Sequence, residues 1–183
     1  MLSRRRFVSS ILAVSLSFWS WLNFSLPALA LGGKLPALNA PAPAFTLPTN
    51  TGDGQVSLTD YSGRWVVLYF YPKDFTSGCT IEARRFQQDI SEYSQRNTQI
   101  IGISADSIDT HAKFCDSEGI KFPLLADTNG AVSKTYGSWI GVFSMRHTFL
   151  ISPEGELKYI FTGVNPTVHS KEVLAKLDEI KQA

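Results

Sequence analysis

The amino-acid sequence predicts an α/β domain in which a mixed β-sheet is flanked by helices. Three observations carry this prediction. Strand patterns alternate with helical patterns through the middle of the chain, a β-hairpin and a last helix follow them, and no internal repeat or low-complexity segment interrupts this order. With 183 residues, of which 44% are hydrophobic, the chain is long enough for one well-packed domain.

The strongest strand pattern covers residues 65–71, where every side chain is aromatic, β-branched or leucine. Such a run indicates a central strand that is buried on both faces. Two short strands are predicted before it, the proline-bounded segment 44–48 and the alternating segment 55–58. Further strands are expected at residues 99–104, 122–126, 148–151 and 156–161, of which the last two form a hairpin around the turn 152–155.

Helical spacing predicts the elements that cover the sheet. After the loop 73–78, apolar residues three or four positions apart line one face of a helix: Ala83, Phe86, Ile90 and Tyr93. A second helix is expected over residues 109–118, ended by Gly119 in the position that a helix C-cap favours. A short helix over residues 131–136 and a last helix from Ser170, with Val173, Leu177 and Ile180 on one face, complete the fold.

The first thirty residues differ in composition from the rest of the chain. Arg4, Arg5 and Arg6 precede a serine-diluted apolar stretch that closes on Ala28-Leu29-Ala30, the small-x-small pattern that signal peptidase accepts. The Ser-Arg-Arg-x-Phe arrangement resembles the twin-arginine export signal. We therefore expect an export signal over residues 1–30 and delivery to a periplasm or a thylakoid lumen. A plain secretory signal and an uncleaved membrane anchor are the alternatives.

Cleavage after Ala30 changes the charge balance. The whole chain has 17 basic and 16 acidic residues, a net charge of +1, and loss of three arginines leaves 14 basic against 16 acidic residues, a net charge of −2. No block of either sign is present, which argues against nucleic-acid binding, because that function needs clustered lysine and arginine. Residues 31–43 are expected to form an extended arm rich in glycine and proline, and residues 44–183 the domain.

Cys79 and Cys115 are the two cysteines of the chain. In an exported protein an even pair first suggests a structural disulfide. Cys79, however, is expected at the first turn of the helix that follows the buried strand 65–71. There, unpaired backbone N–H groups and the positive end of the helix macrodipole favour thiolate over thiol, and the thiolate is the nucleophile.

The residues around Cys79 carry a family resemblance. The run Tyr71-Pro72-Lys73-Asp74-Phe75-Thr76-Ser77-Gly78-Cys79-Thr80 contains Pro-x-x-x-Thr-x-x-Cys and resembles the active-site motif of the peroxiredoxins, in particular the peroxiredoxin Q (bacterioferritin comigratory protein) type. Arg146, in the run 146–150, matches a second element of the family at the start of a late strand. The likeness covers residues 38–182. It implies a thioredoxin-like fold and a thiol peroxidase that reduces hydrogen peroxide and organic hydroperoxides in antioxidant defence.

The resemblance also implies roles for single residues. Cys79 attacks one peroxide oxygen and is left as a sulfenic acid. Thr76 holds the peroxide through its hydroxyl group, Arg146 pairs with the thiolate and stabilises charge on the breaking O–O bond, and Pro72 keeps water off the sulfur. Backbone N–H groups of Gly78 and Cys79 complete the donor set. The other charged residues near the motif are expected only to shape the rim of the pocket: Lys73, Asp74 and Glu82.

A second thiol has to close the cycle by condensing with the sulfenic acid to a disulfide. Many peroxiredoxin Q proteins carry it five residues after the peroxidatic cysteine, but that position is Arg84 here. Cys115, 36 residues downstream (115 − 79), resembles the subtype that resolves from the next helix. We expect an intramolecular bond, formed after local unwinding of residues 76–84 and 110–118 and reduced by thioredoxin or a similar dithiol. A one-cysteine enzyme with an inert Cys115 is the alternative.

Neither a metal nor an organic cofactor is implied. The histidines are scattered, no Cys-x-x-Cys occurs and no glycine-rich nucleotide loop is present. Thr76 stands where a thiol–disulfide oxidoreductase would carry its second cysteine, which argues against that function. A peroxide sensor on the same fold and a binding module stapled by a permanent Cys79–Cys115 bond stay open. Proteins of the peroxiredoxin Q type are commonly monomeric, so we expect a monomer.

Overall fold

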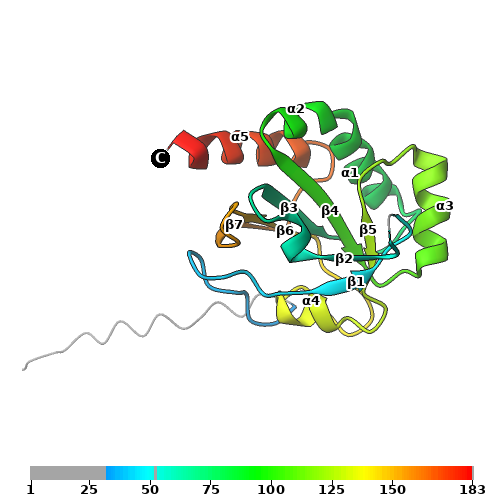
Figure 1. Ribbon diagram of the computed structural model, residues 1–183. Helices are drawn as coiled ribbons and strands as arrows, with labels where there is room; N and C mark the ends of the chain where they lie inside the picture. Colours follow the sequence, from blue (N-terminus) through cyan, green and yellow to red (C-terminus); the bar gives the residue numbers. More distant parts are fainter. Residues whose placement is uncertain (1–31, 52, 183) are drawn as a thin grey trace, which may run out of the picture.

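A computed structural model of the protein describes residues 32–51 and 53–182 (Figure 1). Its elements, in chain order, are β1 Thr46–Pro48, β2 Gln55–Ser57, the 3₁₀ turn η1 Leu58–Tyr61, β3 Trp65–Phe70, α1 Ser77–Gln88, α2 Ile90–Gln95, β4 Thr98–Ser104, α3 Ile108–Glu118, β5 Leu124–Ala126, α4 Ala131–Thr135, β6 His147–Ile151, β7 Leu157–Thr162 and α5 His169–Gln182. The five-stranded sheet has the order β5-β4-β3-β6-β7, while β1 and β2 form a separate antiparallel pair. Strands β3, β4 and β5 run parallel, and β6 pairs antiparallel with both β3 and β7. The mixed sheet predicted from the sequence is confirmed.

The two faces of the sheet are covered by different elements. One face packs against α1, α3 and α5, and the other against the β1–β2 pair and the end of α4 (Figure 1). Alternate side chains of β3 pack on opposite faces of the sheet. Val67 and Tyr69 pack on the face covered by the helices, whereas Val66 and Leu68 pack on the opposite face. All four side chains are at most 2% exposed. The prediction that this strand is buried on both faces is confirmed.

The sheet topology brings two distant segments of the chain together. β3 ends at Phe70, and α1 begins seven residues later at Ser77. Because β6 runs antiparallel to β3, with Thr148 opposite Tyr69, the start of β6 lies beside the carboxyl end of β3. Arg146, the residue directly before β6, is therefore placed next to the start of α1.

The helix after Cys79 differs from the prediction. The sequence indicated one helical face through Tyr93, whereas Asp89 separates α1 from α2. The Asp89 carboxylate binds the start of α5 instead, where it accepts from Ser170 Oγ at 2.7 Å and pairs with Lys171 Nζ at 2.9 Å. These bonds join Asp89 to a helix about eighty residues further along the chain, so they cannot be read from apolar spacing. Tyr93 is still fully buried, so the apolar face continues across the break.

Residues 32–44 run along the domain and are hydrogen-bonded to it. The Asn39 N–H donates to Leu157 O at 2.7 Å, and the Ala42 N–H donates to Gly155 O at 2.9 Å. This part of the chain thus lies against the turn between β6 and β7 and the start of β7.

The export signal expected over residues 1–30 lies outside the described residues. Within residues 32–51 and 53–182, no helix combines the length and the apolar character that crossing a bilayer requires.

Candidate active site

Cys79 is the third residue of α1. Thr76 is the N-cap, with extended backbone angles (φ −84°, ψ 145°), and its carbonyl oxygen accepts the Thr80 N–H at 2.9 Å. The Cys79 side chain is 1% exposed and is a free thiol. At this end of the helix the N–H groups of the first turn lack helical partners, and together with the helix macrodipole they favour a negative charge.

The guanidinium group of Arg146 lies against the Cys79 sulfur. Arg146 Nη2 donates to Cys79 Sγ over 3.4 Å, while Nη1 forms an ion pair with Glu82 Oε2. Gly78 leaves room for this approach, because a Cβ atom there would stand 3.2 Å from Arg146 Nη2 and the guanidinium group would have to shift slightly. The structure thus brings Cys79 and Arg146 together although 67 residues separate them in the sequence.

Glu82 holds the guanidinium group from the other side. Its side chain comes from α1, three residues after Cys79, and is fully buried. Burial raises the pKa of Glu82 to about 7, although the charge and the hydrogen bond of Arg146 lower it. Burial lowers the pKa of Arg146, but Glu82 and Cys79 raise it, and the net direction is upward. Arg146 therefore keeps its positive charge beside the sulfur.

The expectation that Asp74 and Glu82 shape the rim of the pocket is wrong. Asp74 is 2% exposed and Glu82 0% exposed. Each carboxyl group is buried against a specific partner, His111 for Asp74 and Arg146 for Glu82. Buried ionisable groups persist only when paired in this way, and the partners lie too far along the chain for spacing to reveal them.

Thr76 and Pro72 lie in the loop between β3 and α1. The Thr76 hydroxyl donates to the Lys73 carbonyl oxygen at 2.9 Å, and the residue is exposed. Because its hydrogen is already donated, the Thr76 oxygen has lone pairs free to accept a hydrogen bond from a bound molecule. Pro72 is half-buried.

Cys115 is a second buried thiol, on α3. It is 8% exposed, free, and part of the same apolar cluster as Cys79. Burial raises the pKa of Cys115 to about 11; the charges of Asp74 and Asp116 act in the same direction, and Asn50 opposes them. At neutral pH Cys115 is therefore a thiol, the less nucleophilic form, in this environment.

Two buried histidines lie in the elements next to Arg146, His147 at the start of β6 and His169 at the start of α5. His147 shares a hydrogen bond with Ser138 Oγ (2.9 Å), and burial lowers its pKa. His169 Nε2 binds Thr148 Oγ1 at 2.8 Å. Burial and the charge of Arg146 lower the pKa of His169 to about 4. Both rings are therefore neutral packing groups at neutral pH.

His169 makes the fold sensitive to acid. In the unfolded chain this histidine titrates near about 6.5, so the unfolded state binds more protons than the folded state below that pH. We expect the free energy of unfolding to decrease as the pH falls from about 6.5 to about 4, by at most about 3 kcal/mol from this group. Urea unfolding at neutral pH and at about pH 4.5 measures the change.

The variant His169→Gln is the matched control for this titration. Glu82 acts in the opposite direction, because its raised pKa lets the folded state bind the extra proton between about 4.5 and 7. The contribution of His169 is therefore the difference between the wild type and the variant. If the free energy of unfolding fell equally in the wild type and in His169→Gln between neutral pH and about pH 4.5, His169 would not be the source of the acid sensitivity.

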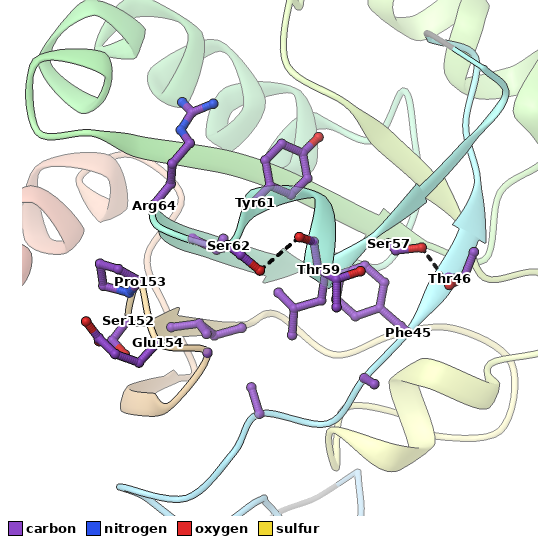
Figure 2. Close-up of a pocket in the computed structure, with 16 residues that line it drawn as sticks. Phe45, Thr46, Ser57, Thr59, Tyr61, Ser62, Arg64, Ser152, Pro153 and Glu154 are labelled. Carbon is purple, nitrogen blue, oxygen red and sulfur yellow. Dashed lines mark hydrogen bonds between the residues drawn. The ribbon is translucent and has the colours of Figure 1, made fainter.

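A cavity of about 530 Å³ lies away from Cys79 (Figure 2). It is bounded by the arm, the segment from β2 through η1, and the turn between β6 and β7. Hydroxyl groups at its wall bind one another or the backbone, as Thr46 Oγ1 does with Ser57 Oγ (2.7 Å) and Ser62 Oγ with Thr59 O (2.9 Å). The Cys79 thiol does not line this cavity and lies buried at the start of α1.

Known proteins resemble the chain over most of its length. A sequence model of the AhpC/TSA family matches residues 38–160. The peroxiredoxin Bcp of Xanthomonas campestris is 37% identical over 151 residues, which cover 76% of this chain and 93% of that protein.

Solved structures share the fold. The reduced 2-Cys peroxiredoxin of Plasmodium vivax superposes with a TM-score of 0.73 at 30% identity and covers 80% of this chain and 98% of its own. The bacterioferritin comigratory protein of Xanthomonas campestris, solved as trapped intermediate and ligand complexes that concern its alkyl peroxide reduction activity, has a TM-score of 0.66 at 33% identity and covers 80% of this chain and 94% of its own.

Proposed function

This chain belongs to the AhpC/TSA family, and we propose that it reduces peroxides with Cys79 as the attacking thiolate and Cys115 as the resolving thiol. The thioredoxin-like fold and the thiol peroxidase activity, both expected from the sequence, are confirmed by its relatives. The single observation that supports the role of Cys79 is the 3.4 Å contact between its sulfur and Arg146 Nη2 at the start of α1.

The first step transfers one peroxide oxygen to Cys79. The thiolate attacks one oxygen, the O–O bond breaks, and the other oxygen leaves as hydroxide or alkoxide and takes up a proton. Cys79 becomes a sulfenic acid, and the peroxide becomes water or an alcohol. Arg146, held by Glu82, donates where negative charge develops on the separating oxygens. The exposed Thr76 oxygen accepts a hydrogen bond from the peroxide.

The second step joins the two cysteines. The Cys115 thiol attacks the sulfenic sulfur of Cys79, a disulfide forms, and the oxygen leaves as water. Proteins of this family use thioredoxin-like reductants. A dithiol of this kind returns both cysteines of this chain to thiols and is itself oxidised to a disulfide.

We expect Cys115→Ser, given one equivalent of peroxide, to stop at the sulfenic acid of Cys79. The first step needs only Cys79 and its neighbours, whereas a serine hydroxyl cannot form the disulfide. A 1,3-diketone probe should label Cys79 as its sulfenic acid in the variant, and turnover with thioredoxin should fall to background. Unchanged turnover would make the protein a one-cysteine enzyme and remove Cys115 from the mechanism.

Export of the protein is part of the proposal. It is supported by the arginines and the small-x-small pattern within residues 1–30. Amino-terminal sequencing of the protein from its native cells is expected to begin at Leu31. A chain that retains Met1 would favour the membrane anchor or contradict export.

A monomeric state is proposed on the resemblance to the peroxiredoxin Q type. Light scattering of the reduced protein is expected to give the mass of a single chain. A dimer mass would contradict the proposal, and the exposed apolar residues between α4 and β6, Ile140, Val142 and Phe143, are the first place to look for the contact.

A further inference from the structure

A buried hydrogen-bonded cluster joins the loop before Cys79 to the helix that carries Cys115. Asp74 belongs to the loop and His111 to α3, and His111 Nδ1 lies 2.8 Å from Asp74 Oδ2. Both side chains are 0% exposed. Tyr71, directly after β3, donates its hydroxyl hydrogen to Asp74 Oδ1 at 2.7 Å. Both carboxylate oxygens are thus occupied, and the three residues are called the Asp74 cluster below.

Two further contacts hold the same loop. The Asp74 N–H donates to Asp106 Oδ2 at 2.9 Å, in the turn between β4 and α3. The Phe75 ring packs edge-on against Phe114 of α3, with ring centroids 5.2 Å apart. Phe75 has a positive φ of 59°, and a bulky residue in the left-handed region is strained. The loop therefore keeps its conformation only while its neighbours hold it.

His111 is anchored through one of its two ring nitrogens. Nδ1 faces Asp74, whereas Nε2 is buried, and no atom of residues 32–51 and 53–182 bonds to it. The His111 ring is therefore held in the cluster through Nδ1, which also lies 3.4 Å from the Tyr71 hydroxyl oxygen.

The cluster lies where the resolving step has to change the fold. Asp74 precedes Cys79 by five residues, and His111 precedes Cys115 by four, about one helical turn. The two sulfurs are not bonded, and α1 and α3 are both intact around them. A disulfide requires sulfurs about 2.05 Å apart, and the burial of Cys115 keeps it a thiol. Formation of the bond therefore has to move Cys79, Cys115 or both from the positions that they occupy in the two intact helices.

We propose that the Asp74 cluster is a latch that keeps the two cysteines apart and sets how fast Cys115 reaches oxidised Cys79. The inference rests on the proposed roles of these cysteines. While the latch is closed, the loop holds Cys79 in its peroxide-reducing geometry. When Asp74 and His111 separate, the first turns of α3 unwind and expose Cys115. The members of the cluster are positioning residues, which act on the sulfurs through the loop and the helix.

The latch has a chemical consequence because the sulfenic acid of Cys79 has two fates. Attack by the Cys115 thiol gives the disulfide and water. Reaction with a second peroxide transfers another oxygen to Cys79, which gives the sulfinic acid and one molecule of water or alcohol. The ratio of the two products depends only on steps after the sulfenic acid, so a slower first step or a smaller folded fraction leaves it unchanged. A weaker latch favours the disulfide.

The test is the hydrogen peroxide concentration at which half of Cys79 becomes sulfinic acid, read from peptide masses. We expect Asp74→Asn and His111→Leu each to raise this concentration about tenfold, the factor that one charge-assisted hydrogen bond is worth. Tyr71→Phe should change it less, in the same direction. The double variant should match Asp74→Asn, because the contact that His111→Leu removes is already broken there.

Arg84→Gln is the matched control. Arg84 of α1 forms an ion pair with Glu118 of α3, but the Arg84 side chain is 59% exposed. Arg84→Gln also removes a link between the two helices, but water screens the exposed Arg84 end of this pair, so the concentration should stay within about twofold. Unchanged values in both latch variants, with the disulfide still forming, would overturn the latch and leave the proposed function intact. A wild-type protein that forms no Cys79–Cys115 disulfide overturns both.

A measurement on the wild type does not depend on the folding of any variant. A buried imidazole N–H proton that is hydrogen-bonded to a carboxylate exchanges slowly with water. With labelled histidine, the His111 Nδ1–H signal is expected in the NMR spectrum of the reduced protein and should be lost in the disulfide form. A signal that persists after the disulfide has formed would overturn the latch.

Discussion

Cys79→Ser is expected to lower the rate of peroxide reduction by roughly 10⁴-fold or more, because it removes the nucleophile on which every later step depends. The serine hydroxyl is close in size to the thiol, so the buried start of α1 should keep its packing. Stopped-flow consumption of hydrogen peroxide with a dithiol reductant measures the loss, and circular dichroism checks the fold.

Cys115→Ser is the control for Cys79→Ser, since it removes the other buried thiol. It should leave the first oxidation at the wild-type rate while abolishing turnover. If Cys79→Ser kept substantial peroxidase activity, or if both variants slowed the first oxidation equally, Cys79 would not be the attacking residue.

Arg146→Gln is expected to lower the rate of Cys79 oxidation by roughly 10²–10³-fold, the usual effect of removing one preorganised donor from a developing negative charge. The guanidinium group donates to Cys79 Sγ over 3.4 Å. Glutamine is uncharged, and its side chain cannot contact Cys79 and Glu82 at the same time as the guanidinium group does. The measurement is the second-order rate constant for sulfenic acid formation.

Two companion variants separate the role of Arg146 in chemistry from its role in stability. Loss of Arg146 leaves the buried Glu82 without its partner, so the double variant with Glu82→Gln restores a neutral interior and should recover stability without recovering the rate. Arg84→Gln removes an exposed arginine from the same helix and should leave the rate unchanged. A wild-type rate in Arg146→Gln would show that the contact with Cys79 has no catalytic effect.

Much of the fold could be predicted because burial leaves a local pattern. Residues 65–71 indicated a strand buried on both faces, and Gly119 indicated the end of α3, where it adopts φ 67°. The break at Asp89 could not be predicted, because it depends on bonds between Asp89 and α5, about eighty residues further along the chain.

The part of the candidate site that could be predicted consists of the residues that match the sequence motif. Cys79, Thr76 and Arg146 were singled out from the sequence, and antiparallel pairing of β6 with β3 explains why the arginine reaches the cysteine. Asp74 and Glu82 were misjudged as rim residues. Their burial depends on partners 37 and 64 residues away in the sequence, and charge alone indicated exposure.

The most direct test of the account is the mass of the reduced protein after one equivalent of hydrogen peroxide. A two-cysteine mechanism predicts the loss of two hydrogens and a single linked species that contains the Cys79 and Cys115 peptides. Gain of one oxygen on Cys79 alone would contradict the resolving role of Cys115. No reaction within seconds would contradict the peroxidatic role of Cys79 itself.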